Sequence, residues 1–246
     1  MIRHMIAGAD PVAGLPQENF VKRVFHEEIL FSGVVLLLAG LGPNLFPAAQ
    51  AGLVKFSVLG QYVLLPSVVA FAATVILTVR RGHERLTNRV VSGAVAGLAA
   101  TVGLEIVRAT GFRLGWMPGD LPRLMGVLLT DRFMLGPSLL SDVLGWSYHF
   151  WNGLCFGVIF TVMFGRRSLL WAVVYAQLIG IGFLLSPAVK SLGIGFMGLE
   201  MPSMPVTVVL AHLAYGMILG VVTRRLVRDE GWLLGTFFTD HSRDAR

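Results

Sequence analysis

The sequence contains a long uncharged stretch that decides the fold class, FSVLGQYVLLPSVVAFAATVILTV at residues 56–79, and this stretch ends at Arg80-Arg81. About 20 consecutive apolar residues are enough for one helix to cross a bilayer. Pro66, inside the stretch, lacks a backbone N–H and predicts a kink. The stretch therefore predicts a transmembrane helix that ends at an arginine pair.

The rest of the chain has the same apolar character. Hydrophobic residues make up 55% of it, charged residues only 14%, and the mean hydropathy is +0.73. In a soluble domain about 25% of the residues are charged. We therefore expect an all-α fold, a polytopic transmembrane helical bundle with about six spans. The expected spans are residues 28–45, 56–79, 90–111, 143–164, 169–187 and 204–222.

Less apolar segments surround these spans, and the bundle as a whole is expected at residues 28–225. Residues 1–27 carry charges and contain no signal-peptide core, so we expect a cytoplasmic tail there. The first span is short, because its apolar run ends at Gly42-Pro43-Asn44. We expect an outer loop at residues 112–142, with a turn and a short interfacial helix, and a second cytoplasmic tail at residues 226–246.

The distribution of Lys and Arg between alternate loops predicts the orientation of the bundle. Fourteen of these residues fall on the side of the two tails and of the arginine pairs, against five on the other side. Cytoplasmic loops carry the excess of positive charge in membrane proteins, so we expect both termini inside the cell. The net charge of +6 is not arranged in a basic stripe with interleaved aromatic residues, so we expect no nucleic-acid partner.

Two of the expected helices share an internal repeat. HFWNGLCFG at residues 149–157 and HLAYGMILG at residues 212–220 both read His-x3-Gly-x3-Gly, and an arginine pair follows each of them. A spacing of four places the histidine and both glycines on one helix face, where small residues let a second helix approach closely. We therefore expect packing of the GxxxG type at Gly93, Gly97, Gly153, Gly157, Gly216 and Gly220.

The same pattern places three ionisable side chains at one depth. Counted at about 1.5 Å per residue, Glu105, His149 and His212 lie roughly 9–12 Å below the outer ends of their helices. Such groups usually face the bundle interior and have a partner or a function. Three site functions fit: a divalent metal on all three, a haem b held axially by the two histidines, or a proton or substrate relay. Supporting polar residues are Asp142, Asn152, Tyr215 and Arg108.

A purely structural role fits these residues as well. A neutral histidine can donate one hydrogen bond and accept another across a helix interface, and Glu105 can pair with Arg108 one turn away. No helix has the H-E-x-x-H or E-x-x-H spacing that marks a metal site. Cys155, the single cysteine, excludes an intrachain disulfide and is expected to be a small buried hydrophobic side chain.

Three functions remain open from the residues alone, and whether the protein is an enzyme is not determined. The first is metal or haem binding near the outer face of the bilayer, in a respiratory or redox system. The second is an accessory subunit of a larger membrane complex or a homo-oligomer, in which the glycine faces contact other subunits. The third is a small-solute or ion transporter, for which Gly42-Pro43 is the candidate helix break.

Four motifs form a layout from about residue 90 onward: SGAVAGLAAT at residues 92–101, His149 with its glycine face, Pro187 after the fifth span, and AHLAYGMILG at residues 211–220. This layout, over residues 90–225, resembles the YagU-like family of uncharacterised bacterial inner-membrane proteins. The resemblance implies a four-helix unit in the bacterial inner membrane, and it implies no known activity.

Overall fold

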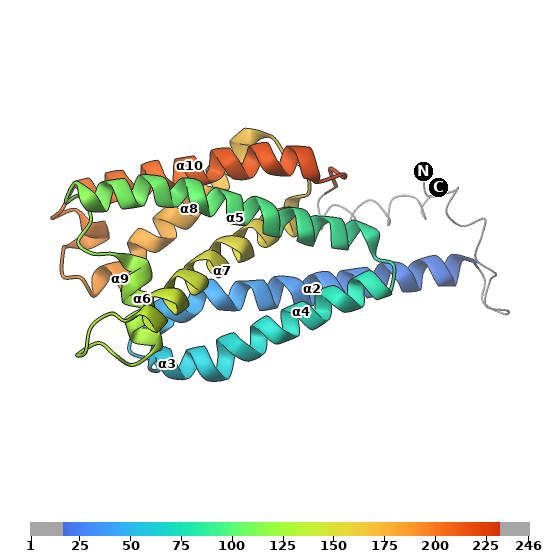
Figure 1. Cartoon of the computed structure of the whole chain (residues 1–246). Coiled ribbons are helices and arrows are strands. Elements are labelled where there is room, and N and C mark those ends of the chain that lie inside the picture. Colours follow the sequence, from blue (N-terminus) through green and yellow to red (C-terminus); the bar gives the residue numbers. More distant parts are fainter. Residues whose placement is uncertain (1–16, 232–246) are drawn as a thin grey trace.

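A computed structural model describes residues 17–231, with side chains from Glu27 onward. All regular structure in that range is helical (Figure 1), so the expected all-α class is confirmed for the described residues. The parts of the two expected tails at residues 1–16 and 232–246 lie outside them. The elements are α2 (Gln17–Gln50), α3 (Phe56–Leu59), the π-helical turn η1 (Gly60–Leu64), α4 (Leu65–Arg80), α5 (Glu84–Arg113), α6 (Leu121–Leu129), α7 (Leu139–Phe164), α8 (Leu169–Leu185), α9 (Pro187–Lys190), the 3-10 turn η2 (Phe196–Gly198) and α10 (Ser203–Leu226).

Four of the described helical segments are long and apolar enough to cross a membrane. They are Glu27–Gln50, Phe56–Arg80, Glu84–Arg113 and Ser203–Leu226. α8 is apolar but shorter. α7 has 26 residues, and polar side chains such as His149 and Asn152 interrupt its apolar sequence. The chain is therefore a membrane protein by the length and composition of these helices, while an expected count of six depends on α7 and α8.

α2 does not break at Gly42-Pro43-Asn44, where the apolar run ends, but continues as a helix through Pro43 and Pro47. Each proline removes one hydrogen bond from the helix, and a neighbouring helix contacts the backbone at the residue before each proline. The hydroxyl of Tyr148, on α7, donates to Gly42 O at 2.7 Å and accepts from Phe46 N at 3.2 Å. A contact between distant parts of the chain thus holds together a turn that the local sequence predicts to be a break.

The helix of the second span is irregular near Pro66 but does not break there. It lies in the first turn of α4, directly after the π-helical turn Gly60–Leu64. A π-helical turn widens the helix by one residue, and a proline in a first helical turn has no partner to lose. The segments α3, η1 and α4 therefore form one interrupted span.

Glycines set a very close crossing between α5 and α7, at four of the positions where the sequence predicted glycine packing. A Cβ atom added to Gly97 would lie 2.3 Å from Gly153 O, and one added to Gly157 would lie 2.2 Å from Gly93 O. Real Cβ atoms do not approach backbone oxygen so closely, so these four positions accept only glycine without movement of a helix. The two backbones lie almost in contact, as small residues allow in membrane helices.

The second copy of the repeat packs on a different helix. Gly216 and Gly220 of α10 face α8, where an added Cβ would lie 2.7 Å from Val173 Cα and 2.7 Å from Leu169 Cδ1, respectively. The tyrosine of this copy, Tyr215, donates from its hydroxyl to Gly153 O at 2.8 Å and so joins α10 to α7. The two copies therefore use the same spacing of residues to pack against two different neighbours.

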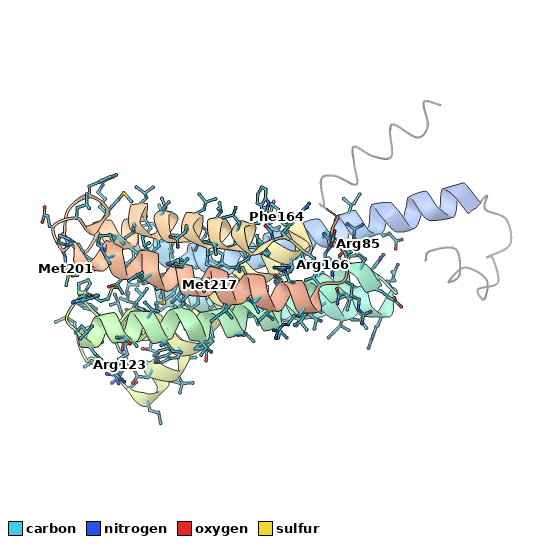
Figure 2. The ribbon with its side chains drawn as sticks, turned by 90° about the horizontal axis from the view of Figure 1, so that it is seen from above. Arg85, Arg123, Phe164, Arg166, Met201 and Met217 are labelled. Atoms are coloured by element: carbon cyan, nitrogen blue, oxygen red, sulfur yellow. The ribbon has the colours of Figure 1, made fainter. Side chains whose placement is uncertain are left out.

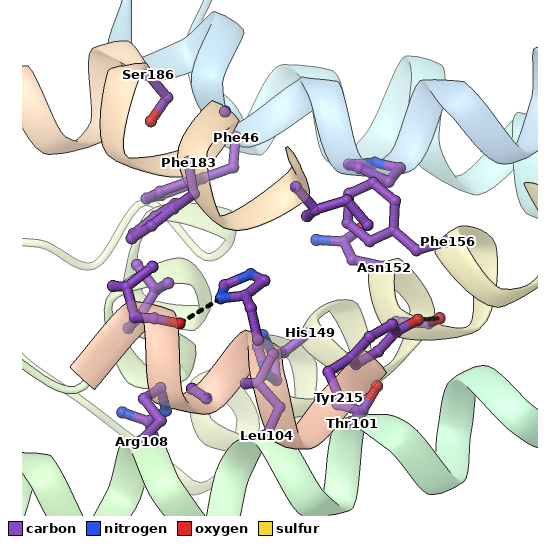
Figure 3. Close-up of a pocket in the computed structure, with 18 of the residues that line it drawn as sticks. Phe46, Thr101, Leu104, Arg108, His149, Asn152, Phe156, Phe183, Ser186 and Tyr215 are labelled. Carbon is purple, nitrogen blue, oxygen red and sulfur yellow. Dashed lines mark hydrogen bonds between the residues drawn. The ribbon is translucent and has the colours of Figure 1, made fainter. Parts of the chain in front are cut away.

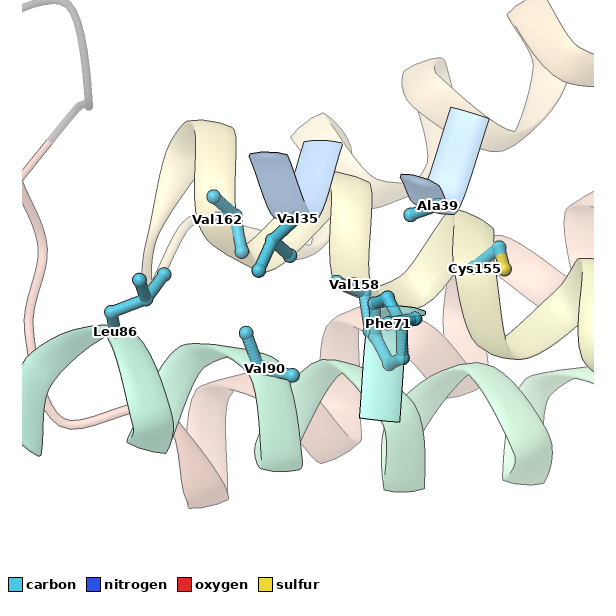
Figure 4. Close-up of a cluster of buried hydrophobic side chains, with 8 residues drawn as sticks. All are labelled: Val35, Ala39, Phe71, Leu86, Val90, Cys155, Val158 and Val162. Atoms are coloured by element: carbon cyan, nitrogen blue, oxygen red, sulfur yellow. The ribbon is translucent and has the colours of Figure 1, made fainter. Parts of the chain in front are cut away.

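Side chains from α2, α4, α5 and α7 meet in one buried cluster (Figure 4). Lipid tails are as apolar as this cluster, so close van der Waals packing, rather than removal from water, stabilises it inside a membrane. Cys155 is fully buried in the cluster, as expected. The members are Val35, Ala39, Phe71, Leu86, Val90, Cys155, Val158 and Val162.

The two ends of the bundle differ in their residues. Figure 2 shows Arg85 and Arg166 at one end and Arg123 and Met201 at the other. The turn between α4 and α5 lies at the first end, whereas α6 and α9 lie at the second (Figure 1). This separation of the ends is the structural basis on which an orientation in the membrane can be proposed.

The segment that follows α10, residues 227–231, lies against the arginine-rich end. Arg89 is only 2% exposed, and it donates to the carboxylate of Asp229 and to Val162 O, the latter at 2.7 Å. Burial raises the pKa of Asp229, but the hydrogen bond and charge of Arg89, with the charge of Arg85, outweigh burial and leave that pKa below its ordinary value. The charged carboxylate therefore fastens this segment to α5.

Candidate functional site

Glu105 of α5 and His149 of α7 meet inside the bundle, as their equal depth predicted. Glu105 Oε1 lies 2.8 Å from His149 Nε2, and both side chains are largely removed from solvent. The glycine crossing explains this contact, because Gly97 lies two turns before Glu105 and Gly153 lies one turn after His149. Where these two glycines touch, the two polar side chains are brought onto facing surfaces.

Arg108 completes this buried group and links it toward the surface. Its Nε and Nη2 atoms donate to the two carboxylate oxygens of Glu105 at 2.7 and 2.8 Å, and Nη2 lies 3.2 Å from Asp120 Oδ1. Arg123 lies 4.0 Å from Asp120 and 3.5 Å from Asp142. Asp142 therefore pairs with Arg123 at the rim. Because two carboxylates face Arg108, its positive charge is fully compensated.

His212 does not join Glu105 and His149. Its Nδ1 atom lies 2.8 Å from Val208 O, one turn earlier in α10, and a Cβ added to Gly180 of α8 would lie 2.9 Å from the ring. Among the described residues, no group of three or more His, Cys, Asp or Glu side chains could hold a metal ion. The three expected metal ligands are therefore not assembled, because α8 and the backbone of α10 fix where the His212 ring lies.

A pocket of about 490 Å³ lies beside the Glu105–His149 pair (Figure 3). Its wall includes residues of α2, α5, α6, α7, α8, α9 and α10, and most of that wall is apolar or aromatic. The polar residues are Asn44, Thr101, Arg108, His149, Asn152, Ser186, Thr207, His212 and Tyr215. The apolar side chains include Phe46, Leu104, Met117, Met125, Phe156, Ile179, Phe183 and Ala211. His149 and His212 therefore line the same pocket, although they do not belong to a group of side chains that could bind one metal ion.

Besides His149 Nε2, which lies 2.8 Å from Glu105 Oε1, residues that line this pocket carry three buried polar atoms with no hydrogen-bond partner among the described residues. They are Arg108 Nη1, Asn152 Oδ1 and Ser186 Oγ. Roughly 90% or more of buried polar groups in folded proteins do have a partner, and an unpaired one costs about 1–3 kcal/mol. One donor, one acceptor and one hydroxyl that can act as either therefore belong to residues that line the same cavity.

Sequence reasoning identified part of this site and missed the rest. It named Arg108, His149 and Asn152, because they follow from the repeat and from depth. It did not assign Ser186 or Phe46 to a site, because neither the repeat nor the depth of the helices singled them out. Membership of a pocket depends on how α2 and α8 approach the repeat helices, and no local pattern carries that information.

Comparison with known proteins gives one match. Residues 87–232 match a protein family described as "Family of unknown function (DUF6789)". No curated protein and no solved structure matches the chain. The matched segment contains Glu105, Arg108, His149 and Asn152, whereas α2, which forms one wall of the pocket, lies before it.

Proposed function

The chain belongs to the DUF6789 family, whose function is unknown, and we propose that it is a six-span membrane protein that binds a neutral, amphipathic small molecule in the pocket beside Glu105 and His149. One observation carries the proposal: three residues that line a mostly apolar cavity each carry a buried polar atom without a protein partner. Such a cavity suits a ligand with a long apolar part and one small polar end.

The six-span count is supported by the dimensions of α7 and α8. Their 26 and 17 residues correspond to about 39 and 26 Å at a rise of about 1.5 Å per residue, close to the roughly 30 Å of a bilayer core. The polar residues of α7, such as His149 and Asn152, face the pocket. A helix whose polar side chains face the bundle interior can still span a membrane.

The orientation is supported by the arginines at one end of the bundle. Arg80, Arg81, Arg166 and Arg167 follow spans that end there, and the positive-inside rule assigns such an end to the cytoplasm. Both termini would then be cytoplasmic, and α6 and α9 would lie outside. The resemblance to the YagU-like family supports the bacterial inner membrane as the location of the chain.

Labelling of single cysteines in intact bacterial cells tests this topology, in a Cys155→Ala background. Met134, in the α6–α7 loop, is 91% exposed, and Met134→Cys is expected to react with a membrane-impermeant maleimide added to cells with a permeabilised outer membrane. Arg80→Cys, at the opposite end, is expected to react only after the inner membrane is broken. Reaction of both cysteines from the same side would contradict six spans, and the reversed pattern would contradict the orientation.

The charges beside the pocket favour a neutral ligand. Arg108 is the charged donor that faces the cavity, and Glu105 and Asp120 already compensate its charge. An anionic ligand bound to Arg108 would bring a third negative charge next to two carboxylates, which is unfavourable in a low-dielectric interior. A hydroxyl or carbonyl group would accept from Arg108 Nη1 without that cost.

The unpaired atoms also suggest what the polar end of the ligand carries. Arg108 Nη1 needs an acceptor, and Asn152 Oδ1 needs a donor. A glycerol monoester supplies both, with an ester carbonyl and two hydroxyl groups on a single apolar chain. A monoacylglycerol is therefore the probe with which we expect binding to be found.

Loss of the unpaired acceptor tests the proposed site. The purified protein in liposomes is photolysed with a monoacylglycerol that carries a diazirine in its acyl chain, and labelled peptides are quantified by mass spectrometry. Wild-type protein is expected to be labelled at residues that line the pocket. Asn152→Leu removes one hydrogen bond at similar side-chain volume, so its affinity is expected to fall about tenfold, roughly 1.4 kcal/mol.

Gln177→Leu is the matched control for Asn152→Leu. Gln177 also carries an amide on a helix of the bundle, where it is half-buried, but it donates to Val209 O at 3.1 Å and does not line the pocket. Its replacement is expected to leave the affinity for the probe unchanged. Equal affinities of the wild type and Asn152→Leu, or equal losses in both variants, would refute the site. Metal or haem binding, a redox role, a role as complex subunit and transport remain predictions from the sequence.

A further inference from the structure

We infer that the ligand reaches this pocket from within the bilayer, through a lateral opening between α2 and α8, and that it is therefore a neutral lipid-like amphiphile dissolved in the outer leaflet. This inference rests on the proposed function and names the source and the class of its ligand. It is supported by the exposure of two residues that line the pocket, by the packing of the helices and by the apolar surface around the opening.

The exposed part of the pocket wall lies on two helices. Of the residues that line the pocket, all of which the structure describes, only Asn44 of α2 and Gly182 of α8 are exposed. The remaining lining residues are buried or half-buried. A Cβ added to Gly182 would meet no other atom within 4 Å, so the wall has free space at this point. The pocket is therefore open where α2 and α8 face each other.

The packing of the helices explains why the opening lies there. α2 packs mainly on α7 and α4, whereas α8 packs mainly on α10. The short helix α9 contacts both α2 and α8 and connects them at their outer ends. Since the two long helices do not pack extensively on each other, a side opening remains below α9. The glycine at position 182 keeps the α8 side of this opening free of a side chain.

The surface around the opening is apolar. Leu178, Ile181 and Leu185 of α8 are 62%, 42% and 54% exposed, as expected for side chains that face lipid. Gly182 lies three residues before the end of α8 and Asn44 six residues before the end of α2, which corresponds to roughly 5 and 9 Å at the rise of an α-helix. In the proposed orientation, the opening lies within the outer leaflet, where a water-soluble ligand is scarce.

The interior of the pocket is arranged to receive such a molecule. Phe46 and Phe183 lie close together on the α2 and α8 side, with Arg108 across the cavity (Figure 3). An apolar chain can pack on the two aromatic rings while the polar end reaches Arg108 and Asn152. The pocket is apolar at its opening and has polar side chains inside. A monoacylglycerol has the same order of polarity, with an apolar chain and a polar end.

Blocking the opening with side groups of different size tests the route. Gly182→Cys, in a Cys155→Ala background and in liposomes, is modified with either methyl methanethiosulfonate or the bulky, apolar pyrene maleimide. The rate at which bound photoreactive monoacylglycerol exchanges with unlabelled monoacylglycerol is then followed by photolysis at successive times. The pyrene group is expected to slow exchange at least about tenfold, and the methylthio group to change it less than about twofold, since exchange follows the barrier to release.

Leu178→Cys is the matched control, because Leu178 lies one turn away on α8, is exposed, and does not line the pocket. A pyrene group there is expected to leave the exchange rate unchanged. Equal exchange rates with pyrene at positions 178 and 182 would overturn the lateral route while leaving binding intact. Absence of specific labelling in the unmodified protein would instead overturn the proposed function itself, so the two failures are distinct.

Discussion

Replacement of Gly157 by valine is expected to abolish the stable bundle. A Cβ at this position would lie 2.2 Å from Gly93 O and 2.7 Å from Gly97 Cα. Both of these are backbone atoms of α5, so relief requires that the whole helix move away from α7. Insertion of one or two methyl groups into a packed interior costs about 1–3 kcal/mol, and more where the backbone must shift.

We expect the cost for Gly157→Val to exceed about 3 kcal/mol for this reason. The yield of folded protein and its midpoint of unfolding in a denaturing detergent titration would measure this loss. Gly33→Val is the matched control, since Gly33 lies in α2 and an added Cβ there would meet no atom within 4 Å. If the two variants unfold at the same midpoint, the α5–α7 crossing does not limit stability.

Replacement of Arg108 by methionine is expected to be the most damaging change in the site. Arg108 and Glu105 are both buried, and the change removes both hydrogen bonds that the guanidinium donates to Glu105. Removal of one partner from a buried ion pair costs about 3–5 kcal/mol, because the remaining charge has no compensation. His149 Nε2 lies 2.8 Å from the same carboxylate and remains beside it in this variant.

The double variant Glu105→Gln/Arg108→Met distinguishes the effect of an uncompensated charge from the effect of a changed side-chain shape. It removes both charges, so most of the stability lost in Arg108→Met is expected to return. Arg123→Met is the exposed control: Arg123 also faces two carboxylates, but its side chain is 56% exposed, and about 1 kcal/mol or less is expected. An Arg108→Met variant as stable as Arg123→Met, or a double variant without recovery, would contradict a buried ion pair.

The helices and the glycine faces of the α5–α7 crossing were predictable from sequence. Inside lipid, each backbone group must find its hydrogen-bond partner within its own helix, so an apolar stretch such as residues 56–79 is enough to predict one. Gly97 and Gly153 were predictable as a contact, because a spacing of four defines a helix face. The shared level of Glu105 and His149 followed from depth, which is counted along each helix from its own end.

Other features were not predictable, because they depend on residues far away in the chain. α2 passes through Pro43 because the hydroxyl of Tyr148 bonds to Gly42 O and Phe46 N. The prediction for His212 failed in a similar way: the repeat placed its ring at the depth of His149, but Gly180 and Val208 determine where the ring lies. Equal depth on two helices does not imply contact.

The sequence by itself determined that this is a helical membrane protein with glycine faces and a buried polar level near one end. These properties arise from hydropathy, length and periodicity, which act within single helices. Only the tertiary structure decided that Arg108, Asn152 and Ser186 line one pocket and that this pocket opens between α2 and α8. The physical reason is that a cavity is formed by the surfaces that helices leave unfilled when they cross, and the crossings depend on all the helices together.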